Sequence, residues 1–398
     1  MDFDCIIIGG GSAGLLASKE IAKAGCSVCV IEEHQEIGYP VKCSGLFSIS
    51  GLKELGIKPE PSFTTSTIKG GRFYSPSGTE ILAYSDKERA HVVERKIFDK
   101  HLAREAIRAG AKIKLRTRMT GVKANKGISV STEGIDGKET LKSHLLIGAD
   151  GIGSNVARAF GIKTPKKVVA CAQIEVESAE IDQDTAEMYF GREYAPNFYA
   201  WIMPKGDVYE VGVGSRSKEH TPLELLKKFI QKHPIASKKI KSESMLEVNI
   251  GGIPLGLPGD TVADYTMLVG DAASQVKSST GGGVITGGIA ARIAGRAAVK
   301  ALEERDFSKE FLKREYEDKW IDEIGSELQA HFALREMFDN ISDSDMDELF
   351  KIANEEGIPK LMVKFENTDR PSEFVKGLLK NERMLEKLQN FMDLKSLS

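Results

Sequence analysis

The sequence predicts an α/β fold in which a parallel sheet with helices is combined with an inserted antiparallel sheet and a helical C-terminal region. The apolar run Cys5 to Ile8 leads into a glycine-rich turn and then into apolar residues at helical spacing. Residues 165–264 hold short apolar stretches typical of strands, interrupted by a helical pattern at 221–232. Residues 308–398 are amphipathic at helical spacing.

The composition excludes several classes of protein. The chain has 398 residues and a net charge of −3, and this lack of a basic excess argues against nucleic acid as a partner. Its first residues, MDFDCIIIGG, lack the basic start and the cleavage site of a signal peptide. No apolar run reaches the roughly 18 residues of a membrane-spanning helix. We therefore expect a cytoplasmic protein, soluble or at most peripheral to a membrane.

The cysteines indicate neither a disulfide framework nor a metal site. There are five, an odd number, and they are scattered, unlike those of small secreted domains. Cys26 and Cys29 form a C-x-x-C motif, but they lie on a stretch that predicts a buried strand, and no second pair completes a zinc site. We expect no metal.

The N-terminal stretch DCIIIGGGSAGLLASKEIAKAG predicts a Rossmann-like, dinucleotide-binding β-α-β unit. Gly9 permits the tight turn, Gly11 lets the backbone approach a pyrophosphate, and Gly14 lets the helix pack closely on the strand. The free N–H groups at the start of the helix suit phosphate oxygens. A second strand, 28–31, ends in Glu32, whose carboxylate can accept hydrogen bonds from a ribose diol.

Two distant stretches favour FAD over a nicotinamide nucleotide. In HLLIGADGIGSNVARAFG, 144–161, a strand ends at Asp150 and a helix follows. Further on, a strand ends at Asp271, and a glycine-rich turn at 281–283 opens an alanine-rich helix. An acid at a strand end suits a polyol hydroxyl, and a helix start suits a phosphate or a flavin carbonyl.

No second, nicotinamide-type unit is predicted. The stretch GVGSRS at 212–217 has two suitable glycines but lacks the third. The residues before it, 208–213, alternate like an exposed strand. A nicotinamide reductant would therefore have no dedicated domain in this chain.

Taken in order, GGGSAG, ADG and GDAA followed by GGG resemble the FAD superfamily of the para-hydroxybenzoate hydroxylase type. ERKIFDKHLAREA, 94–106, matches that group's pattern of Arg, then Phe-Asp, then Leu. The resemblance implies FAD as the cofactor. The expected parts are a discontinuous FAD-binding domain at 1–164 and 265–307, a substrate-binding sheet domain at 165–264 and a helical region at 308–398.

The loop IGYPVKCSGLFS, 37–48, is similar to the Cys-Gly loop of the archaeal geranylgeranyl reductases, the digeranylgeranylglycerophospholipid reductase family. Ser44 stands where many members have glycine. In that family a cysteine approaches the flavin ring, so the resemblance implies that Cys43 is catalytic, as a proton source or as a redox partner of the flavin. The alternative is that Cys43 is only a small loop residue.

The mid-chain stretch APNFYAWIMPKG matches the motif Y-x-W-x-F-P of the same family, with Met203 in place of phenylalanine. On a strand, Tyr199 and Trp201 would share one face. Methionine fills irregular apolar space. The resemblance implies that Tyr199, Trp201 and Met203 line the substrate slot; the alternative is that they are core residues of a sheet.

The resemblance also implies a set of cofactor-binding residues. Arg95 is expected near the FAD phosphates, Asp271 at the ribityl chain, and the backbone of Met119, in the strand IKLRTRM, at the adenine. The full set is Gly9, Gly11, Ala13, Gly14, Glu32, Cys43, Ser44, Leu46, Arg95, Met119, Asp271, Gly283 and Val284.

The function implied is that of an FAD-dependent reductase, which saturates the geranylgeranyl double bonds of archaeal membrane ether-lipid precursors by hydride transfer from reduced flavin. The partners expected are a prenylated lipid and an electron donor, for which ferredoxin, reduced deazaflavin and NADPH stay open. The alternative is an FAD-dependent hydroxylase or halogenase of an aromatic or other small substrate. Such an enzyme needs polar groups to orient its substrate, and residues 165–265 offer few clusters of them.

The C-terminal region predicts amphipathic helices. Ser342, with Asp345 three residues later, predicts a helix start, and Gly357 predicts its end. Pro371 predicts the start of another helix that extends to residue 394. Interfacial anchors usually carry a basic face, so the mixed charges here favour packing, and peripheral membrane contact through these helices is the alternative.

Overall fold

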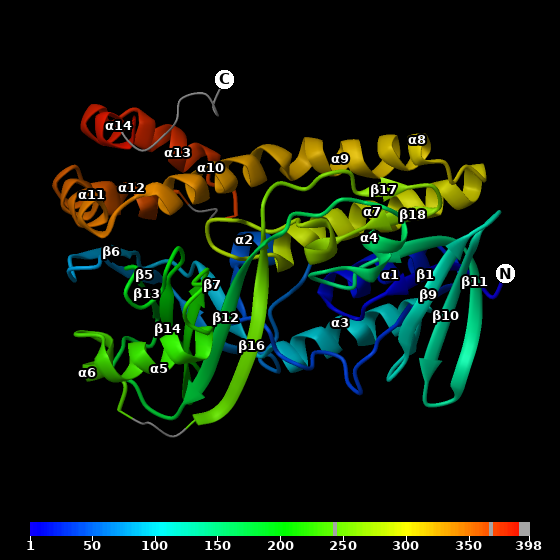
Figure 1. The fold of residues 1–398 in the computed structure, drawn as a ribbon, viewed down its shortest axis with the longest axis horizontal. Helices are drawn as coiled ribbons and strands as arrows, with labels where there is room; N and C mark the ends of the chain where they lie inside the picture. Colours follow the sequence, from blue (N-terminus) through cyan, green and yellow to red (C-terminus); the bar gives the residue numbers. More distant parts are fainter. Residues whose placement is uncertain (242–244, 366–368, 390–398) are drawn as a thin grey trace. The chain divides into compact units, whose positions relative to one another are not determined.

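The structure, a computed structural model, describes residues 1–241, 245–365 and 369–389. Contacts divide the chain into two units, each built from three segments. Figure 1 shows the course of the chain, coloured along the sequence from blue to red. Unit 1 comprises residues 1–41, 95–167 and 254–329, and unit 2 comprises residues 42–94, 168–253 and 330–398. Across the described ranges, no helix combines the length and the apolar character that crossing a membrane requires.

This grouping differs from the sequence-based boundaries in residues 42–94, which were expected in the cofactor domain. They join unit 2 because β5 (Gly70–Tyr74) pairs in parallel with β13 (Thr185–Tyr189), far along the chain. Residues 308–329 join unit 1, where the buried Tyr316 donates a hydrogen bond to the Leu268 carbonyl. Which part binds cofactor and which binds substrate stays a prediction.

The sheet of unit 1 has eight strands and is parallel at its centre. There β1 (Phe3–Ile8) lies between β2 (Val28–Ile31) and β11 (Gly137–Gly148). Cys5, Ile6 and Ile7 are fully buried, as expected of a parallel strand covered on both faces. The other strands are β8 (Lys112–Lys114), β9 (Arg118–Ala124), β10 (Ile128–Gly134), β17 (Val262–Ala263) and β18 (Thr266–Leu268).

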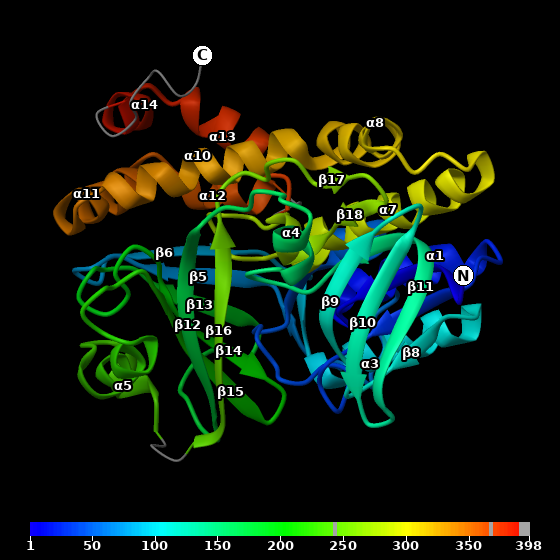
Figure 2. The same ribbon diagram turned by 45° about the vertical axis from the view of Figure 1, so that its right-hand side comes forward.

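The prediction of a single strand at IKLRTRM is wrong, because the chain forms two strands there. β8 runs parallel to β2 and ends at Lys114, and Arg116 then adopts a left-handed conformation with φ of 47°. β9 begins at Arg118 and pairs antiparallel with β10, which pairs antiparallel with β11 (Figure 2). Met119 therefore lies in this antiparallel extension of the sheet.

The helices of unit 1 pack closely on one another. α1 (Ser12–Lys23) contacts both α3 (Arg95–Ala109) and α7 (Val284–Glu304). A Cβ at Gly295 would lie 2.8 Å from the Ala17 carbonyl oxygen, so α7 approaches α1 at a distance that only glycine allows. The remaining helical segments are α4 (Asn155–Ala159), η1 (Gly270–Ala273), α8 (Lys309–Leu312), η2 (Lys313–Glu317), α9 (Asp318–Trp320) and η3 (Ile321–Gly325).

Unit 2 contains a seven-stranded sheet in the order β16-β12-β15-β14-β13-β5-β6. The expected strands of residues 165–264 are confirmed, as is the helix at 221–232. The strands not yet located are β6 (Glu80–Tyr84), β12 (Lys167–Val176), β14 (Ala200–Lys205), β15 (Val208–Ser215) and β16 (Met245–Leu255). A smaller sheet joins β3 (Leu46–Ser48), β7 (Ala90–Val93) and β4 (Thr64–Ile68), and a short helix, α2 (Ile49–Glu54), follows β3.

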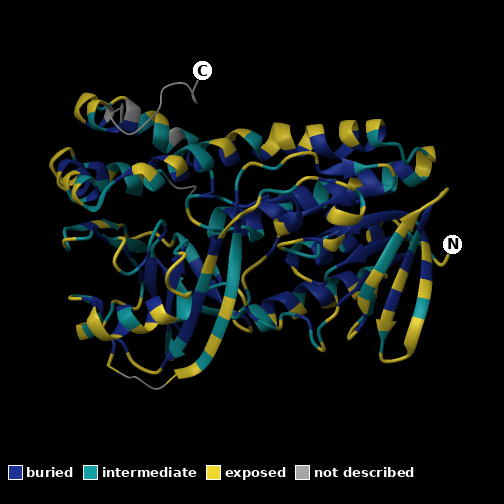
Figure 3. Cartoon of the chain, viewed as in Figure 1, coloured by how far each residue is buried: buried dark blue, intermediate teal, exposed yellow. Residues whose placement is uncertain are grey.

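The two faces of the large sheet carry different clusters. On one face, α5 (Pro222–Lys232), whose start is capped by Thr221, buries Leu226 and Phe229 against alternate residues of β12 and β15. A short helix, α6 (Ala236–Lys239), contributes Ala236 to the same cluster. The opposite face carries a smaller cluster that includes Trp201. In Figure 3 the central strands β14 and β15 are mostly dark blue, the edge strand β16 is mostly teal and yellow, and the exposed residues of α5 are yellow.

The C-terminal helices of unit 2 pack by their apolar sides, as the sequence predicted. Met337, Phe350 and Leu378 belong to one buried cluster that also includes Ile81 of β6. Ser342 caps the second helix by accepting a hydrogen bond from the Asp345 N–H. The helices are α10 (Ser326–Asn340), α11 (Asp343–Glu355), α12 (Ile358–Lys364), α13 (Ser372–Leu379) and α14 (Glu382–Gln389). The expectation of one last helix from Pro371 to residue 394 is wrong, because the chain turns at residues 380–381 and forms α13 and α14 instead; residues 390–394 lie outside the described residues.

Candidate functional site

In unit 1 the three glycines after β1 have different surroundings, so a Cβ would have a different effect at each of them. Gly9 has a φ of 106°, and a Cβ there would lie 2.2 Å from the Ala149 carbonyl oxygen. A Cβ at Gly14 would lie 2.1 Å from the Gly9 carbonyl oxygen. A Cβ at Gly11 would meet nothing within 4 Å. Packing therefore requires Gly9 and Gly14, whereas Gly11 faces open space.

The N-terminus of α1 fits an anionic group. Gly11 is the N-cap residue and provides no side-chain acceptor for the first N–H groups of the helix. Uncapped N–H groups and the helix dipole together favour a phosphate. The open space at Gly11 lies at the same end of the helix, so the residues present fit the pyrophosphate of FAD.

Glu32 lies next to this loop and is 8% exposed. Its Oε2 accepts a hydrogen bond from the Gly10 N–H at 2.7 Å. Its Oε1 accepts one from the His34 N–H at 2.8 Å and lies 2.6 Å from His34 Nδ1. A carboxylate has about four acceptor sites, so this one keeps capacity for a ribose hydroxyl while it holds the glycine loop.

The start of α7 brings several predicted residues together. A Cβ at Gly283 would lie 3.1 Å from Asp271 Oδ1, and Gly283 is an N-cap without a side-chain hydrogen bond. Gly270, with φ of 64°, comes so close to α1 that its Cβ would lie 3.0 Å from the Cβ of Ala13. Ala13, Asp271, Gly283 and the first residue of α7, Val284, therefore gather where two helices begin.

Arg95 begins α3 and forms a forked ion pair with Asp99, with NH2 2.8 Å from Oδ2. Asp99 is 4% exposed, and burial raises the pKa of its carboxyl while Arg95 opposes that shift. This pair fixes the guanidinium at the N-terminal end of α3.

Asp150 and Met119, two residues of unit 1 that lie in motifs of the sequence, have different surroundings. The Asp150 carboxylate accepts hydrogen bonds from the Ser154 hydroxyl and from the N–H groups of Asn155 and Val156. It therefore caps α4, a use that the sequence pattern did not predict. Met119 is partly buried and packs against a buried apolar cluster that includes Ile6 and Val130.

Residues 42–48 of the Cys43 loop lie in unit 2, whereas residues 37–41 belong to unit 1. Gly45 has φ of 76°, and a Cβ there would lie 2.2 Å from the Val93 carbonyl oxygen, so Gly45 rather than Ser44 holds the special backbone conformation. The Gly45 N–H points to Cys43 Sγ at 3.4 Å. Cys43 and Ser44 are half-buried.

The aromatic stretch forms β14 and the residues before it. Trp201 and Met203 belong to a buried cluster against which Leu46 and Tyr199 pack, whereas Ala200 and Ile202 belong to the cluster on the other face. The expected alternation is therefore confirmed: Tyr199 and Trp201 share one face, and Met203 lies on that face too. Cys171 packs against the same cluster, and burial raises the pKa of its thiol, with a further contribution from Cys43.

Gly212 and Gly214, the two glycines of the stretch GVGSRS, explain how the aromatic rings fit against the sheet. A Cβ at Gly212 would lie 2.1 Å from Trp201 Cζ2, and one at Gly214 would lie 2.3 Å from Phe198 Cδ1. The strand that carries them, β15, is almost entirely buried, so the expectation of an exposed strand there is wrong. It is buried because α5 covers one face and the rings cover the other. The sequence did contain a signal for this fit. Gly212 and Gly214 are spaced by two, and Phe198 and Trp201, on the preceding stretch, are spaced by three.

A buried polar group also lies beside these rings. Glu210, 1% exposed, accepts hydrogen bonds from Trp201 Nε1 and from Gln173 Nε2, each at 3.2 Å. Burial raises the pKa of Glu210 to about 7, and nearby Lys205 opposes that shift. Lys205, itself 6% exposed, is held by Glu175 at 2.5 Å and Glu94 at 3.0 Å. Sequence reasoning missed Glu210 because nothing local distinguishes it from a surface glutamate.

The predicted residues therefore fall into two groups. Unit 1 holds Gly9, Gly11, Ala13, Gly14, Glu32, Arg95, Met119, Asp271, Gly283 and Val284. Unit 2 holds Cys43, Ser44, Leu46, Tyr199, Trp201 and Met203. Among the described residues, no three His, Cys, Asp or Glu side chains gather as a metal site requires, and all five cysteines are free.

Comparison with known proteins identifies first the class and then the family. The FAD binding domain family matches residues 2–292, so the chain is an FAD-dependent oxidoreductase with the cofactor that the sequence predicted. The digeranylgeranylglycerophospholipid reductase of Methanocaldococcus jannaschii is 38% identical over 388 residues, which cover 95% of this chain and 98% of the relative. The chain belongs to the digeranylgeranylglycerophospholipid reductase family.

Solved structures agree with this assignment and confirm the predicted fold class. A geranylgeranyl bacteriochlorophyll reductase-like protein from Thermoplasma acidophilum matches with a TM-score of 0.85 and 27% identity, covering 98% of this chain and 99% of that one. A flavin-dependent brominase matches with a TM-score of 0.68 and 19% identity, covering 88% and 93%. The second likeness shows a shared fold alone.

Proposed function

We propose that this protein uses reduced FAD to saturate geranylgeranyl double bonds in an archaeal ether-lipid precursor. The observation that carries the proposal is the alignment, along 95% of the chain, with a relative named digeranylgeranylglycerophospholipid reductase. The chain itself supplies features that this chemistry needs: uncapped helix starts for a pyrophosphate and an apolar cluster in the sheet unit.

In this proposal unit 1 holds the cofactor. The first N–H groups of α1 bind the pyrophosphate, Glu32 binds the ribose, and Arg95 lies near the phosphates. Asp271 orients the ribityl chain, with Ala13, Gly283 and Val284 lining the cofactor. Met119 meets the adenine through its backbone. When bound, FAD supplies the hydride.

Unit 2 provides the surroundings of the alkene. Tyr199, Trp201 and Met203 line an apolar slot, in which an isolated alkene loses little solvation. Saturation adds a hydride to one carbon and a proton to the other. We assign the proton to the Cys43 thiol, which becomes a thiolate and is reprotonated from solvent between turnovers. Ser44 and Leu46, in the same loop as Cys43, stay predicted cofactor-binding residues.

An anaerobic half-reaction tests the reductase activity. The purified flavoprotein is photoreduced without oxygen and mixed with a detergent-dispersed geranylgeranyl lipid. Re-oxidation of the flavin, with a lipid that has gained two hydrogen atoms for each bond saturated, is the expected result by absorbance and mass spectrometry. Re-oxidation that requires oxygen and yields a hydroxylated product would instead support the hydroxylase alternative.

The same anaerobic measurement identifies the electron donor. Reduced ferredoxin, reduced deazaflavin and NADPH are each mixed with the oxidised flavoprotein without oxygen. The physiological class of donor reduces the flavin at a rate that supports turnover. Because the sequence predicts no second dinucleotide-binding unit, we expect NADPH to be the slowest of the three.

A further inference from the structure

The edge strand β16 exposes a row of large apolar side chains. Leu246 is 61% exposed, Val248 47% and Ile250 59%. These residues alternate along the strand, so they stand on one face of it. We call Leu246, Val248 and Ile250 the β16 strip; Figure 3 shows exposed positions along this strand. Edge strands usually carry charges or prolines that prevent contact with other molecules, and this row carries neither.

The strip stands on the face of the sheet that α5 covers. A Cβ at Gly251 would lie 3.3 Å from the Cβ of Lys42, in the Cys43 loop, so the odd-numbered residues of β16 face that loop. The even-numbered residues face the other way. On the neighbouring strand β12, Ala172 and Ile174 face α5, and Val168, at the same parity, is 39% exposed. The helix therefore leaves the sheet edge uncovered.

The segment that leads into the strip is strongly basic. From residue 225 to 241 the chain has six lysines and no acid, although the whole protein has a net charge of −3. Lys228, Lys239 and Lys241 are paired with Glu193, Glu187 and Glu180. Lys227, Lys232 and Lys238 are exposed on α5 and α6.

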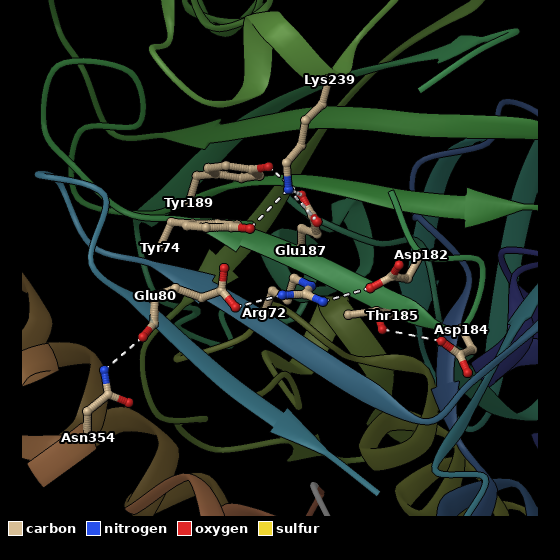
Figure 4. Close-up of polar contacts among 10 residues, drawn as sticks. All are labelled: Arg72, Tyr74, Glu80, Asp182, Asp184, Thr185, Glu187, Tyr189, Lys239 and Asn354. Atoms are coloured by element: carbon tan, nitrogen blue, oxygen red, sulfur yellow. Dashed lines mark hydrogen bonds and ion pairs between the residues drawn. The ribbon is translucent and has the colours of Figure 1, made fainter. Parts of the chain in front are cut away.

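The end of this segment is held rigidly beside the sheet. Lys239 Nζ donates to the Tyr74 hydroxyl at 2.9 Å and to Glu187 at 2.7 Å (Figure 4). The Glu180 N–H donates to the Lys239 carbonyl, and the Lys241 N–H donates to the Ser178 carbonyl, just past the end of β12. Lys238 and Lys241 therefore lie at a fixed place at the end of the strand next to β16.

From this arrangement we propose that the β16 strip and the exposed lysines of α5 and α6 form a surface that docks on an anionic lipid bilayer. The apolar side chains would enter the boundary between headgroups and acyl chains, and Lys227, Lys232 and Lys238 would lie among the phosphates. The proposal rests on the proposed function for its partner, because a reductase of membrane-lipid precursors works where its substrate is dissolved. The binding itself does not require that activity.

Charge complementarity favours a bilayer over a second copy of the chain. A bilayer of acidic lipids offers negative charge to the lysines and an apolar layer to the strip. A second copy offers the same lysines and the same apolar row. Pairing of two copies through their edge strands would satisfy the backbone of β16 but would not neutralise the lysines.

Vesicle co-sedimentation of the FAD-loaded full chain tests the proposal. Vesicles of phosphatidylcholine alone are compared with vesicles of phosphatidylcholine and phosphatidylglycerol in equal parts. We expect binding to the mixed vesicles only, weakened by salt. The triple variant L246S/V248S/I250S should remain in the supernatant. Each of Lys227→Gln, Lys232→Gln and Lys238→Gln should weaken binding about fivefold.

Matched substitutions in unit 1 serve as controls. Ile135 is 69% exposed and Lys138 is exposed, so Ile135→Ser and Lys138→Gln remove the same chemistry elsewhere and should leave binding unchanged. Turnover of a detergent-dispersed substrate should be unchanged in all these variants, which shows that they fold and separates this test from that of the reductase activity. Wild-type protein that stays in the supernatant with mixed vesicles overturns the proposal, as does a strip variant that binds like wild type. A dimer in light scattering that the strip variant converts to a monomer would assign the strip to self-association instead.

Discussion

Trp201 Nε1 donates a hydrogen bond to Glu210 Oε1, at 3.2 Å, in the interior of the sheet unit. The carboxyl is 1% exposed and holds the indole of a residue whose ring lies directly over Gly212. Position and orientation of this ring thus depend on two residues of the neighbouring strand, β15, neither of which belongs to the aromatic motif itself.

The stability of the protein should depend on the protonation of Glu210. Burial raises the pKa of this group from 4.5 to about 7, so the folded protein binds its proton more tightly than the unfolded chain. This contribution is fully present below about pH 4.5 and is lost as the pH rises through about 7. The loss is on the order of 3 kcal/mol. Glu210→Gln, which is neutral throughout, should lack this component when urea unfolding is compared between about pH 5 and about pH 8. An equal pH dependence in both proteins contradicts it.

Gly212→Ala should displace the Trp201 ring. The added Cβ would lie 2.1 Å from Cζ2. Overpacking of a buried site costs about 1–3 kcal/mol, so the free energy of unfolding should fall by that amount. Lipid turnover should fall, while FAD binding, measured by absorbance, should be unchanged. Gly121→Ala in β9 is the control, because a Cβ there meets nothing within 4 Å. A Gly212→Ala protein as stable and active as wild type would contradict this account of the ring.

Gly11→Ala should remove FAD without unfolding the protein. Its Cβ would meet no protein atom within 4 Å, and Gly11 has an ordinary φ of −75°, so the apoprotein should melt as wild type does. The methyl group would occupy the space proposed for the pyrophosphate, and FAD affinity should fall at least about tenfold, or about 1.4 kcal/mol. Gly14→Ala is the contrast, because its Cβ would lie 2.1 Å from the Gly9 carbonyl oxygen and should destabilise the apoprotein. Normal FAD retention in Gly11→Ala would place the phosphates elsewhere.

Cys43→Ala should slow saturation of the alkene without affecting reduction of the flavin. General acid catalysis contributes about 10²–10⁴-fold, and a loss in that range is expected if the thiol supplies the proton. Stopped-flow absorbance separates the two half-reactions. Cys171→Ala is the matched control, since it removes a thiol packed against the same apolar cluster. Unchanged saturation by Cys43→Ala would make Cys43 a structural loop residue.

Asp339→Ala should strongly destabilise unit 2. Asp339 Oδ1 lies 3.0 Å from the guanidinium of Arg335, which is 4% exposed and stacks between Phe198 and Phe338. A second arginine, Arg216, pairs with the other oxygen of Asp339. Removing the partner of a buried charge typically costs about 3–5 kcal/mol. Glu304→Ala, which breaks an exposed i,i+4 pair with Lys300, should cost at most about 0.5 kcal/mol in the same unfolding measurement. Equal effects would show that Arg335 reaches solvent.

Much of the fold could be predicted because local patterns carry it. The period of apolar residues marked β1, the strands of residues 165–264 and α5, and the capping serine Ser342 marked α11. The pattern of residues misses a strand boundary where the backbone conformation sets it, as at Arg116, whose left-handed conformation splits one expected strand in two. The order of residue types in IKLRTRM does not predict that break.

The sequence by itself determined the cofactor and the family, because glycines at fixed spacing and acids at strand ends are local features of the chain. It also determined that Tyr199 and Trp201 share a face, since side chains alternate along any strand. Only the tertiary structure decided what those side chains meet: Gly212 beneath Trp201, Glu210 at its indole, and Cys171 and Leu46 in the same cluster. It also decided that residues 42–94 join the sheet unit and that Asp150 caps a helix. The physical reason is that burial, and with it a pKa or the space for a ring, arises from contacts between residues far apart in the chain, which no local pattern records.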